Sequence, residues 1–275
     1  MLNVKPRYIF IISVFSFLLF GCKTTNNVED KNHNSNQYRG YKSNYSHKKY
    51  QNTANDAAPK GPVPNRFKEN KPVDGPFSRY GNPAEYNVDG KTYQVLTRPK
   101  GYHERGLASW YGTKFHSKLT SSGEAYNMYA LTAAHKTLPL PTYVRVKNLD
   151  NGRVAIIKVN DRGPFHSGRI LDLSYGAAVK LGIFPKGTAM VEVDAIMQKD
   201  KIANYYLQVG AFASNTSALN LQAKIKQYSS NKVFIEKDNQ KYLVRVGPIV
   251  SRASSDNLKK LLQSKGVKEI FTMIQ

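Results

Sequence analysis

Tyr143-Val-Arg-Val-Lys147 and Arg153-Val-Ala-Ile-Ile-Lys-Val159 are the stretches that decide the fold of this chain. The first alternates apolar and charged side chains, which predicts a strand with one buried face, and the second is a nearly continuous apolar run typical of a buried strand. Met190-Val-Glu-Val-Asp-Ala-Ile196 alternates again, and Ser174 is placed to cap a short helix. Short strands with so little helix predict a compact β-barrel over residues 85–198.

A hairpin precedes these strands. Tyr86-Asn-Val88 and Thr92-Tyr-Gln-Val-Leu96 flank Asp89-Gly90, and Asp-Gly between two apolar runs favours a two-residue hairpin turn. We therefore expect ordered structure to begin near residue 85.

The segment 204–275 contains an internal repeat, because Leu207-Gln-Val-Gly-Ala-Phe212 is echoed by Val244-Arg-Val-Gly-Pro-Ile249. A helical pattern and a further strand follow each copy, with the helices over 216–228 and 254–264. This βαββαβ order predicts a small α+β domain whose antiparallel sheet is covered on one face by two helices. Side chains alternate between the two faces of a strand. The side chains expected to face the helices are Leu207, Val209, Val244 and Val246. Those expected on the open face of the sheet are Tyr206, Gln208, Leu243 and Arg245.

The N-terminus has the layout of a secretory signal peptide over residues 1–21. Lys5 and Arg7 precede an apolar run, 8–20, which is shorter than the roughly 20 residues of a membrane-spanning helix. Leu19-Phe-Gly-Cys22 resembles the bacterial lipobox, which predicts lipidation of Cys22; the alternative is an ordinary signal that ends beside a chance cysteine. Cys22 is the only cysteine, so it has no disulfide partner. Several acyl chains would hold the protein at a membrane. By resemblance to other lipoproteins, an aspartate after the lipidated cysteine would signal retention in the inner membrane, so Lys23 at that position favours the outer membrane, facing the periplasm.

Residues 22–84 are rich in Asn, Lys, Ser, Gly and Pro without a sustained apolar period, which predicts a lipidated, disordered, flexible linker. The chain carries 41 Lys and Arg against 19 Asp and Glu, a net charge of +22. Such a charge favours a polyanionic partner. Export makes anionic wall polymer or membrane headgroups the accessible ones, so no nucleic acid is expected.

The barrel segment carries a dense series of ordered motifs. They are Gly106-Leu-Ala-Ser-Trp-Tyr-Gly112, Phe115-His116, Thr120-Ser-Ser-Gly-Glu124, Leu131-Thr-Ala-Ala-His135-Lys-Thr-Leu-Pro139, Val144-Arg-Val146, Asn148-Leu149, Asn151-Gly152, Val159-Asn-Asp-Arg-Gly-Pro-Phe165 and Arg169-Ile-Leu-Asp-Leu-Ser174. With them the chain resembles the rare lipoprotein A family of septal lytic transglycosylases. The resemblance implies a six-stranded double-psi β-barrel and an enzyme that cuts peptidoglycan without water, leaving a 1,6-anhydro-muramoyl end. The chain departs from the family pattern at Ser117, Ser121-Ser122 and Pro141.

The resemblance implies functional carboxylates at Asp161 and Glu124, with a histidine at His135. Breaking the glycosidic bond requires an acid for the leaving oxygen and then a base for the C6 hydroxyl, and one carboxyl can serve in both steps. We assign Asp161 as this acid/base, Glu124 as the second carboxylate and His135 as the group that orients or tunes them. Each residue also has a structural interpretation. Asp161 could be an Asx-turn residue with Arg162 as its charge partner. Glu124 could be a solvated turn carboxylate, and His135 a buried structural histidine.

Other residues of these motifs leave two interpretations open. Asp172 lies near the predicted helix start, so a capping role competes with a catalytic one. Trp110 and Tyr111 could stack on sugar or pack in the core.

The repeat of residues 204–275 resembles the sporulation-related repeat (SPOR) domain, whose family binds glycan strands stripped of stem peptides, the wall form of division sites. This resemblance implies glycan binding through Gln208, its sharpest matched position, with Arg245 and Tyr206 beside it. The same element order with basic charge also occurs in RNA-binding domains, but the first strand lacks the paired exposed aromatics that stack on bases.

Two classes of function follow for the chain. The first is an endolytic lytic transglycosylase that acts on peptide-poor strands in septal wall remodelling and daughter cell separation. The second is a non-catalytic peptidoglycan-binding lipoprotein. The joint presence of Glu124, His135 and Asp161 favours the enzyme. No metal-ligand spacing or phosphate loop is visible in the sequence, so we expect no metal and no cofactor.

Overall fold

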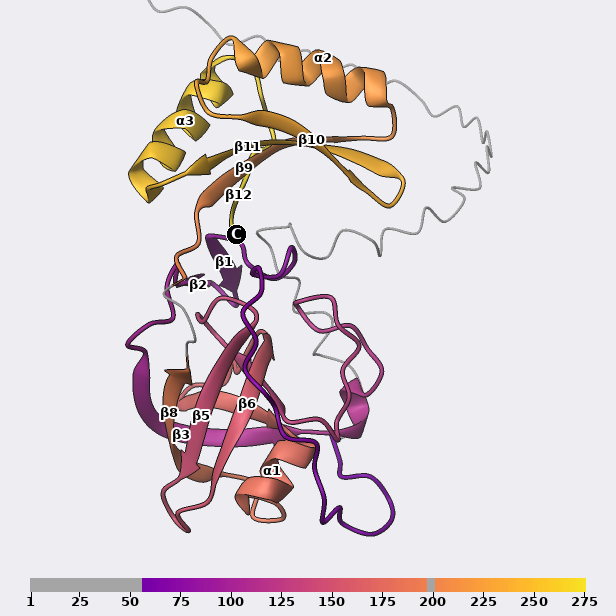
Figure 1. Cartoon of the computed structure of the whole chain (residues 1–275), viewed down its shortest axis with the longest axis vertical. Coiled ribbons are helices and arrows are strands. Elements are labelled where there is room, and N and C mark those ends of the chain that lie inside the picture. Colours follow the sequence, from indigo (N-terminus) through magenta and orange to yellow (C-terminus); the bar gives the residue numbers. More distant parts are fainter. Residues whose placement is uncertain (1–55, 197–200) are drawn as a thin grey trace, which may run out of the picture. The chain divides into compact units, whose positions relative to one another are not determined.

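The computed structural model describes residues 56–196 and 201–275 (Figure 1). The predicted signal peptide, Cys22 and the linker as far as residue 55 lie outside the described residues. Within the described ranges, no helix is both long and apolar enough to cross a membrane.

Six strands form a closed barrel: β3 (His103–Tyr111), β4 (Thr132–His135), β5 (Thr142–Asn148), β6 (Val154–Asp161), β7 (Arg169–Ser174) and β8 (Ala189–Ile196). Their order around the barrel is β3-β7-β4-β6-β5-β8. The pairs β3/β7 and β4/β6 are parallel, whereas the other four pairs are antiparallel. Inside lies a core of fully buried aliphatic side chains that includes Val144, Ile157 and Leu171. The predicted six-stranded barrel is confirmed, and β3, β4 and β7 are strands that the polarity pattern alone did not reveal.

Two short elements complete this part of the chain. Helix α1 (Tyr175–Leu181) begins where the Ser174 side chain accepts a hydrogen bond from the Ala177 N–H and ends at Gly182. Gly182 has a φ of 69°, which is why the chain ends the helix with glycine. A single 3-10 turn, Thr113–Phe115, follows β3. The predicted cap and helix are confirmed.

The predicted hairpin is also present. Strands β1 (Glu85–Val88) and β2 (Lys91–Gln94) pair antiparallel. Asp89 and Gly90 between them have φ values of 50° and 78°, as the mirror-image type I′ turn requires.

The C-terminal segment follows the expected βαββαβ order. It contains β9 (Tyr205–Phe212), α2 (Asn215–Lys226), β10 (Val233–Asp238), β11 (Lys241–Ile249), α3 (Arg252–Ser264) and β12 (Phe271–Ile274). The strands form one antiparallel sheet in the order β10-β11-β9-β12, and both helices lie over the same face of it (Figure 1). The predicted inward-facing residues Leu207, Val209, Val244 and Val246 are buried in the core between sheet and helices.

Residues 56–84, which the composition assigns to a linker, make specific contacts. The Asn70 amide donates to the backbone oxygens of Leu131 and Ile156, and Phe67 packs on the barrel core. Pro83 forms a β-bridge with Met273. Composition did not anticipate these contacts because each depends on one side chain or on backbone groups, and none leaves a periodic apolar pattern.

Candidate active site

The candidate site lies where β6 ends beside the loop of residues 119–125. Asp161 is the last residue of β6 and lies in register with Ala134 of β4. Its Oδ1 accepts hydrogen bonds from the Ser121 N–H at 2.8 Å, the Ser121 hydroxyl at 2.5 Å and the Arg162 N–H at 2.8 Å. The described residues supply no hydrogen bond to Oδ2 of this partly exposed side chain. Asp161 is thus fixed through one oxygen, and the other remains available to a substrate.

Glu124 lies in the same loop and is held by β6. Its Oε1 is 2.5 Å from Lys158 Nζ, and its Oε2 accepts a hydrogen bond from the Asn160 amide at 2.9 Å. Burial raises the pKa of Glu124, but the hydrogen bonds from Lys158 and Asn160 outweigh that effect and hold the pKa below its ordinary value. Glu124 is therefore an ionised carboxylate at neutral pH.

Backbone contacts fix this loop on the strand end. The Ser122 N–H donates to the Asn160 oxygen at 3.2 Å, and the Thr120 N–H donates to the Glu124 oxygen at 2.8 Å. Gly81 packs against the outside of the loop so closely that a Cβ there would lie 2.6 Å from the Ser121 oxygen. Only glycine fits this approach, so the 78–84 segment helps to place the Ser121 groups that hold Asp161.

Arg162 is not the charge partner of Asp161 that one reading of the sequence offers. Its guanidinium is buried and donates to backbone oxygens, among them Leu138 at 2.5 Å and Gly81 at 2.9 Å, and to Asn82 Oδ1 at 3.0 Å. Only its backbone N–H contacts Asp161. Arg162 thus links the strand end to two other chain segments, and sequence adjacency alone could not reveal the direction of its side chain.

His135 is the last residue of β4 and is 3% exposed. Its Nδ1 accepts the N–H groups of Thr137 and Leu138, and its Nε2 lies 2.7 Å from the Tyr102 hydroxyl. Burial, with Arg162 and Lys136 nearby, lowers the pKa of His135 to about 3. The ring is therefore neutral, with its proton on Nε2. Because residue 134 is the one in register with Asp161, the His135 side chain points to the opposite side of the strand.

Three further residues singled out in the sequence have defined environments. Ser174 and not Asp172 caps α1, so the capping interpretation of Asp172 is wrong. Trp110 lies edge-on to Phe184 and is tilted at 60° to Tyr175, and Tyr111 stacks on Tyr126 with ring centroids 4.4 Å apart. These aromatic side chains serve packing on the barrel wall.

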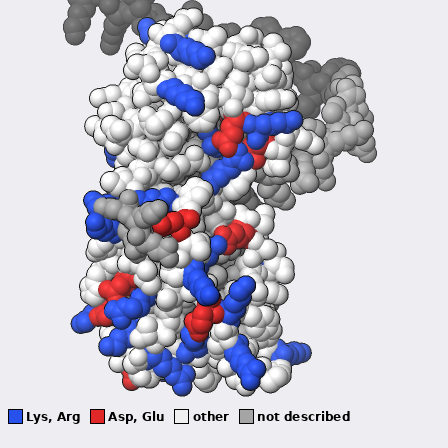
Figure 2. Space-filling model, in the orientation of Figure 1, with Lys and Arg blue, Asp and Glu red and all other residues white. Residues whose placement is uncertain are grey.

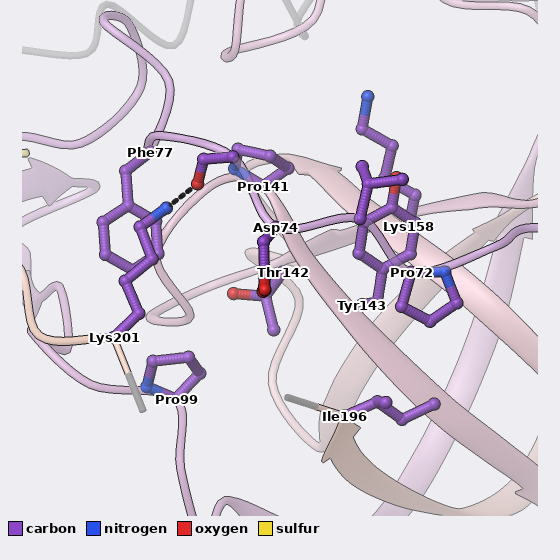
Figure 3. A pocket seen from close by; sticks show the side chains of 12 residues that line it. Pro72, Asp74, Phe77, Pro99, Pro141, Thr142, Tyr143, Lys158, Ile196 and Lys201 are labelled. Atoms are coloured by element: carbon purple, nitrogen blue, oxygen red, sulfur yellow. Dashed lines mark hydrogen bonds between the residues drawn. The ribbon is translucent and has the colours of Figure 1, made fainter. Parts of the chain in front are cut away.

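Lys158 connects Glu124 to a neighbouring pocket of about 130 Å³. The pocket is bounded by the 72–77 segment, the start of β5 and Lys201 (Figure 3). Figure 3 shows the amine end of Lys158 pointing away from Ile196 at the other end of the pocket. The stem of Lys158 therefore lines the pocket while its Nζ pairs with Glu124.

The predicted glycan-binding residues of the sheet occupy the face opposite the helices but are mostly covered. Gln208 is 4% exposed and Arg245 1%, whereas Tyr206 is partly exposed. Arg245 forms an ion pair with Glu236, and Tyr206 lies edge-on to Phe234. Within the described ranges, Oε1 of Gln208 is buried without a hydrogen-bond partner. Alternation gave the correct face but could not show how deeply these side chains lie.

Basic side chains are spread over the visible face of the molecule, and acidic ones gather beside them in a few places (Figure 2). Among the described residues, no group of three or more His, Cys, Asp or Glu side chains is arranged to hold a metal ion.

Comparisons with known proteins bear on both halves of the chain. A family profile described as lytic transglycolase, with the double-psi β-barrel, matches residues 103–193, and the SPOR domain profile matches residues 202–272. The fold, the site and these matches define the class of lytic transglycosylases with a SPOR domain.

The Vibrio cholerae protein named endolytic peptidoglycan transglycosylase RlpA is 40% identical over 229 residues, 79% of this chain and 87% of the relative. The Pseudomonas aeruginosa protein of the same name is 59% identical over 111 residues, which are 40% of this chain and 33% of the relative. The chain belongs to the RlpA family. A Clavibacter michiganensis expansin structure aligns with a TM-score of 0.31 at 12% identity, over 55% of this chain and 81% of that one, a similarity too low to support an argument.

Proposed function

We propose that the chain is an endolytic lytic transglycosylase that cleaves the bond between N-acetylmuramic acid and N-acetylglucosamine in peptide-poor glycan strands, leaving 1,6-anhydro ends. The observation that carries this proposal is the environment of Asp161. One carboxylate oxygen is anchored by Ser121 and Arg162 while the other is available to a substrate.

Asp161 serves as acid and then as base. Its proton passes to the glycosidic oxygen, which leaves with the electron pair of the broken C1–O bond. The C6 hydroxyl of the same sugar then attacks C1 and returns its proton to Asp161. The hydroxyl competes with water because it already belongs to the reacting ring.

Glu124 and His135 support this chemistry in different ways. Glu124 is held ionised by Lys158 and Asn160, so it supplies negative charge beside the reacting sugar and not a proton. His135 acts at a distance, because its backbone oxygen accepts a 3.3 Å hydrogen bond from Arg162, the residue after Asp161. It is a positioning residue in this proposal.

The C-terminal sheet holds the strand while the barrel cuts it. Tyr206 offers a partly exposed ring, and Gln208 Oε1 is an acceptor without a donor within the described ranges. A sugar hydroxyl could supply that donor once a neighbouring side chain moves aside, because Gln208 is only 4% exposed. Selection of peptide-free strands by this domain would direct the enzyme to the division septum.

The N-terminal sequence supports attachment to the outer membrane through lipid on Cys22. Replacement by serine removes the thiol that would carry the lipid, so Cys22→Ser should release the protein from the membrane fraction. Equal incorporation of labelled fatty acid into both forms would refute lipidation at this residue.

The activity is tested with purified chain and peptide-free glycan strands. We expect soluble fragments with 1,6-anhydro ends from the unaltered chain, and fewer fragments from intact, peptide-bearing wall of the same mass. Binding without any fragments would favour the non-catalytic alternative.

A further inference from the structure

A second carboxyl group lies on the same face of the barrel wall as Asp161. Ala134 of β4 is in register with Asp161 on one neighbouring strand and with Asp172 on the other. Residues in register project from the same side of a sheet, and adjacent strands lie about 4.8 Å apart. The two aspartates are therefore about 10 Å apart at their Cα atoms. Ala134, the residue in register with both, is buried beside Tyr111, Tyr126, Met128 and Tyr175.

Asp172 is held differently from Asp161. Its Oδ1 accepts a hydrogen bond from the Ser109 hydroxyl at 2.6 Å, and its Oδ2 is paired with Arg169 Nη2 at 3.2 Å. Both oxygens thus receive donors, one of them charged, which favours the ionised form. The Asp172 side chain is 18% exposed to solvent, so the carboxylate still reaches the surface of the barrel wall.

Asp172 does not act as a helix cap. The helix that begins three residues later is capped by Ser174, and the described partners of Asp172 are polar side chains on the same face of the wall. An ionised group in a largely dry environment destabilises the fold unless it is compensated. A carboxylate in that setting is well suited to stabilising positive charge that develops during a reaction.

We propose that Asp172 is a further catalytic residue, an ionised carboxylate that faces the sugar ring across Ala134 from Asp161 and stabilises its positive charge during bond cleavage. The proposal rests on the lytic transglycosylase function proposed above. As the C1–O bond breaks, its electron pair leaves with the oxygen that takes the Asp161 proton, and positive charge spreads over C1 and the ring oxygen. Asp172 balances that charge until the C6 oxygen bonds to C1, and it neither gains nor loses a proton.

The surroundings of Asp172 make this role measurable through pH. Burial raises the pKa of Asp172 above its ordinary value, although the Ser109 hydrogen bond and the charges of Arg169, His166 and Lys136 oppose that shift. These are Ser109 on β3, Arg169 on β7 itself, His166 in the loop before β7 and Lys136 after β4; the β4 residue in register is the uncharged Ala134. Activity should fall on the acid side of the pH profile as Asp172 takes up a proton. Loss of the Ser109 hydroxyl should move that acid limb to higher pH.

The first test compares Asp172→Asn with Asp150→Asn, a control in an exposed ion pair with Lys186, in the detergent-solubilised full chain. We expect kcat on peptide-free strands to fall by about a hundredfold or more for Asp172→Asn. KM, strand binding and the thermal midpoint should stay close to those of the control. A kcat within a few-fold of the unaltered chain would overturn the proposal.

The second test remains informative if Asp172→Asn fails to fold. Ser109→Ala leaves both aspartates in place, and the kcat/KM profile of this variant should show its acid limb at higher pH. A merely structural Asp172 would leave the limb where it is, and that result overturns the proposal, as does a shift of the alkaline limb alone. An unaltered chain that forms no 1,6-anhydro ends would instead refute the proposed function itself, and with it this role.

Discussion

The barrel wall and the C-terminal sheet present their candidate functional residues in opposite ways. On the barrel, Asp161 is anchored through one oxygen and partly exposed. On the sheet, Gln208 and Arg245 are almost wholly buried, and Tyr206 is the partly exposed member of the set. In the function proposed above the two regions have separate tasks: the barrel offers a reactive group to the substrate, whereas the sheet offers the partly exposed Tyr206 ring to the glycan strand.

The largest expected effect isolates the barrel. Asp161→Asn keeps the shape of the side chain but removes its proton, so turnover should fall by at least about a hundredfold, the lower range for a positioned acid/base. Strand binding should survive because the sheet is untouched. Fragment release measures the turnover and strand pull-down measures the binding, both on the same preparation. Full turnover in this variant would show that another group is the acid, with Glu124 the next to test.

The second prediction alters the sheet and leaves the barrel intact. Tyr206→Ala removes the partly exposed ring of the sheet, and loss of a stacking contact of about 1.4 kcal/mol lowers affinity about tenfold. Turnover at saturating strand concentration should remain within a few-fold. Titration of labelled strands gives the affinity. Should Tyr206→Ala bind normally while Gln208→Ala does not, the buried amide and not the ring would be the contact.

A third prediction concerns how the stability of the barrel depends on pH. The histidines of the described residues all lie in or beside the barrel, and residues 201–275 contain none. His135 has a pKa of about 3 in the folded chain against an ordinary value of about 6.5. Between these values the unfolded chain binds more protons, so the free energy of unfolding decreases as pH falls. His135 should contribute up to about 1.4 kcal/mol per pH unit.

Urea unfolding at several pH values between 6.5 and 4 measures this dependence, with His135→Gln as the comparison. The variant is expected to be less stable at neutral pH but to show a shallower decrease with acid. An equal decrease in both proteins would mean that His135 is protonated in the folded chain.

Much of this comparison was accessible from the sequence, but not all of it. Alternation in β5, β6 and β8 predicted the barrel, and the repeat around Leu207 and Val244 predicted the α+β domain, because both patterns record burial directly. The burial of Gln208 could not be predicted in this way, since alternation distinguishes two faces but does not say what covers either of them.

The candidate site shows the same limit. The motif implied Asp161 and Glu124 together, and the structure holds both on the end of β6 through Ser121 and Asn160. Ser121 stood in the sequence only as a departure from the family pattern. Its role depends on a contact across 40 residues of chain, which no local pattern records.

The smallest expected effect compares two helix caps. Ser174 is fully buried, caps α1 and also donates to the Ala130 oxygen, whereas the exposed Ser214 only caps α2. Alanine at Ser174 should cost about 2 kcal/mol, the upper range for a cap, and alanine at Ser214 about 0.5 kcal/mol. Chemical denaturation of both variants measures the difference. If both variants lost the same free energy of unfolding, the barrel and the C-terminal domain would depend equally on their helix caps.

The most direct test of the central claim is the chemistry of the products. Peptide-free strands are digested by the purified chain in water enriched in ¹⁸O, and the new fragment ends are analysed by mass spectrometry. Attack by the sugar's own C6 hydroxyl predicts 1,6-anhydro-muramoyl ends without ¹⁸O. Reducing ends that carry ¹⁸O would show hydrolysis by water and contradict the account.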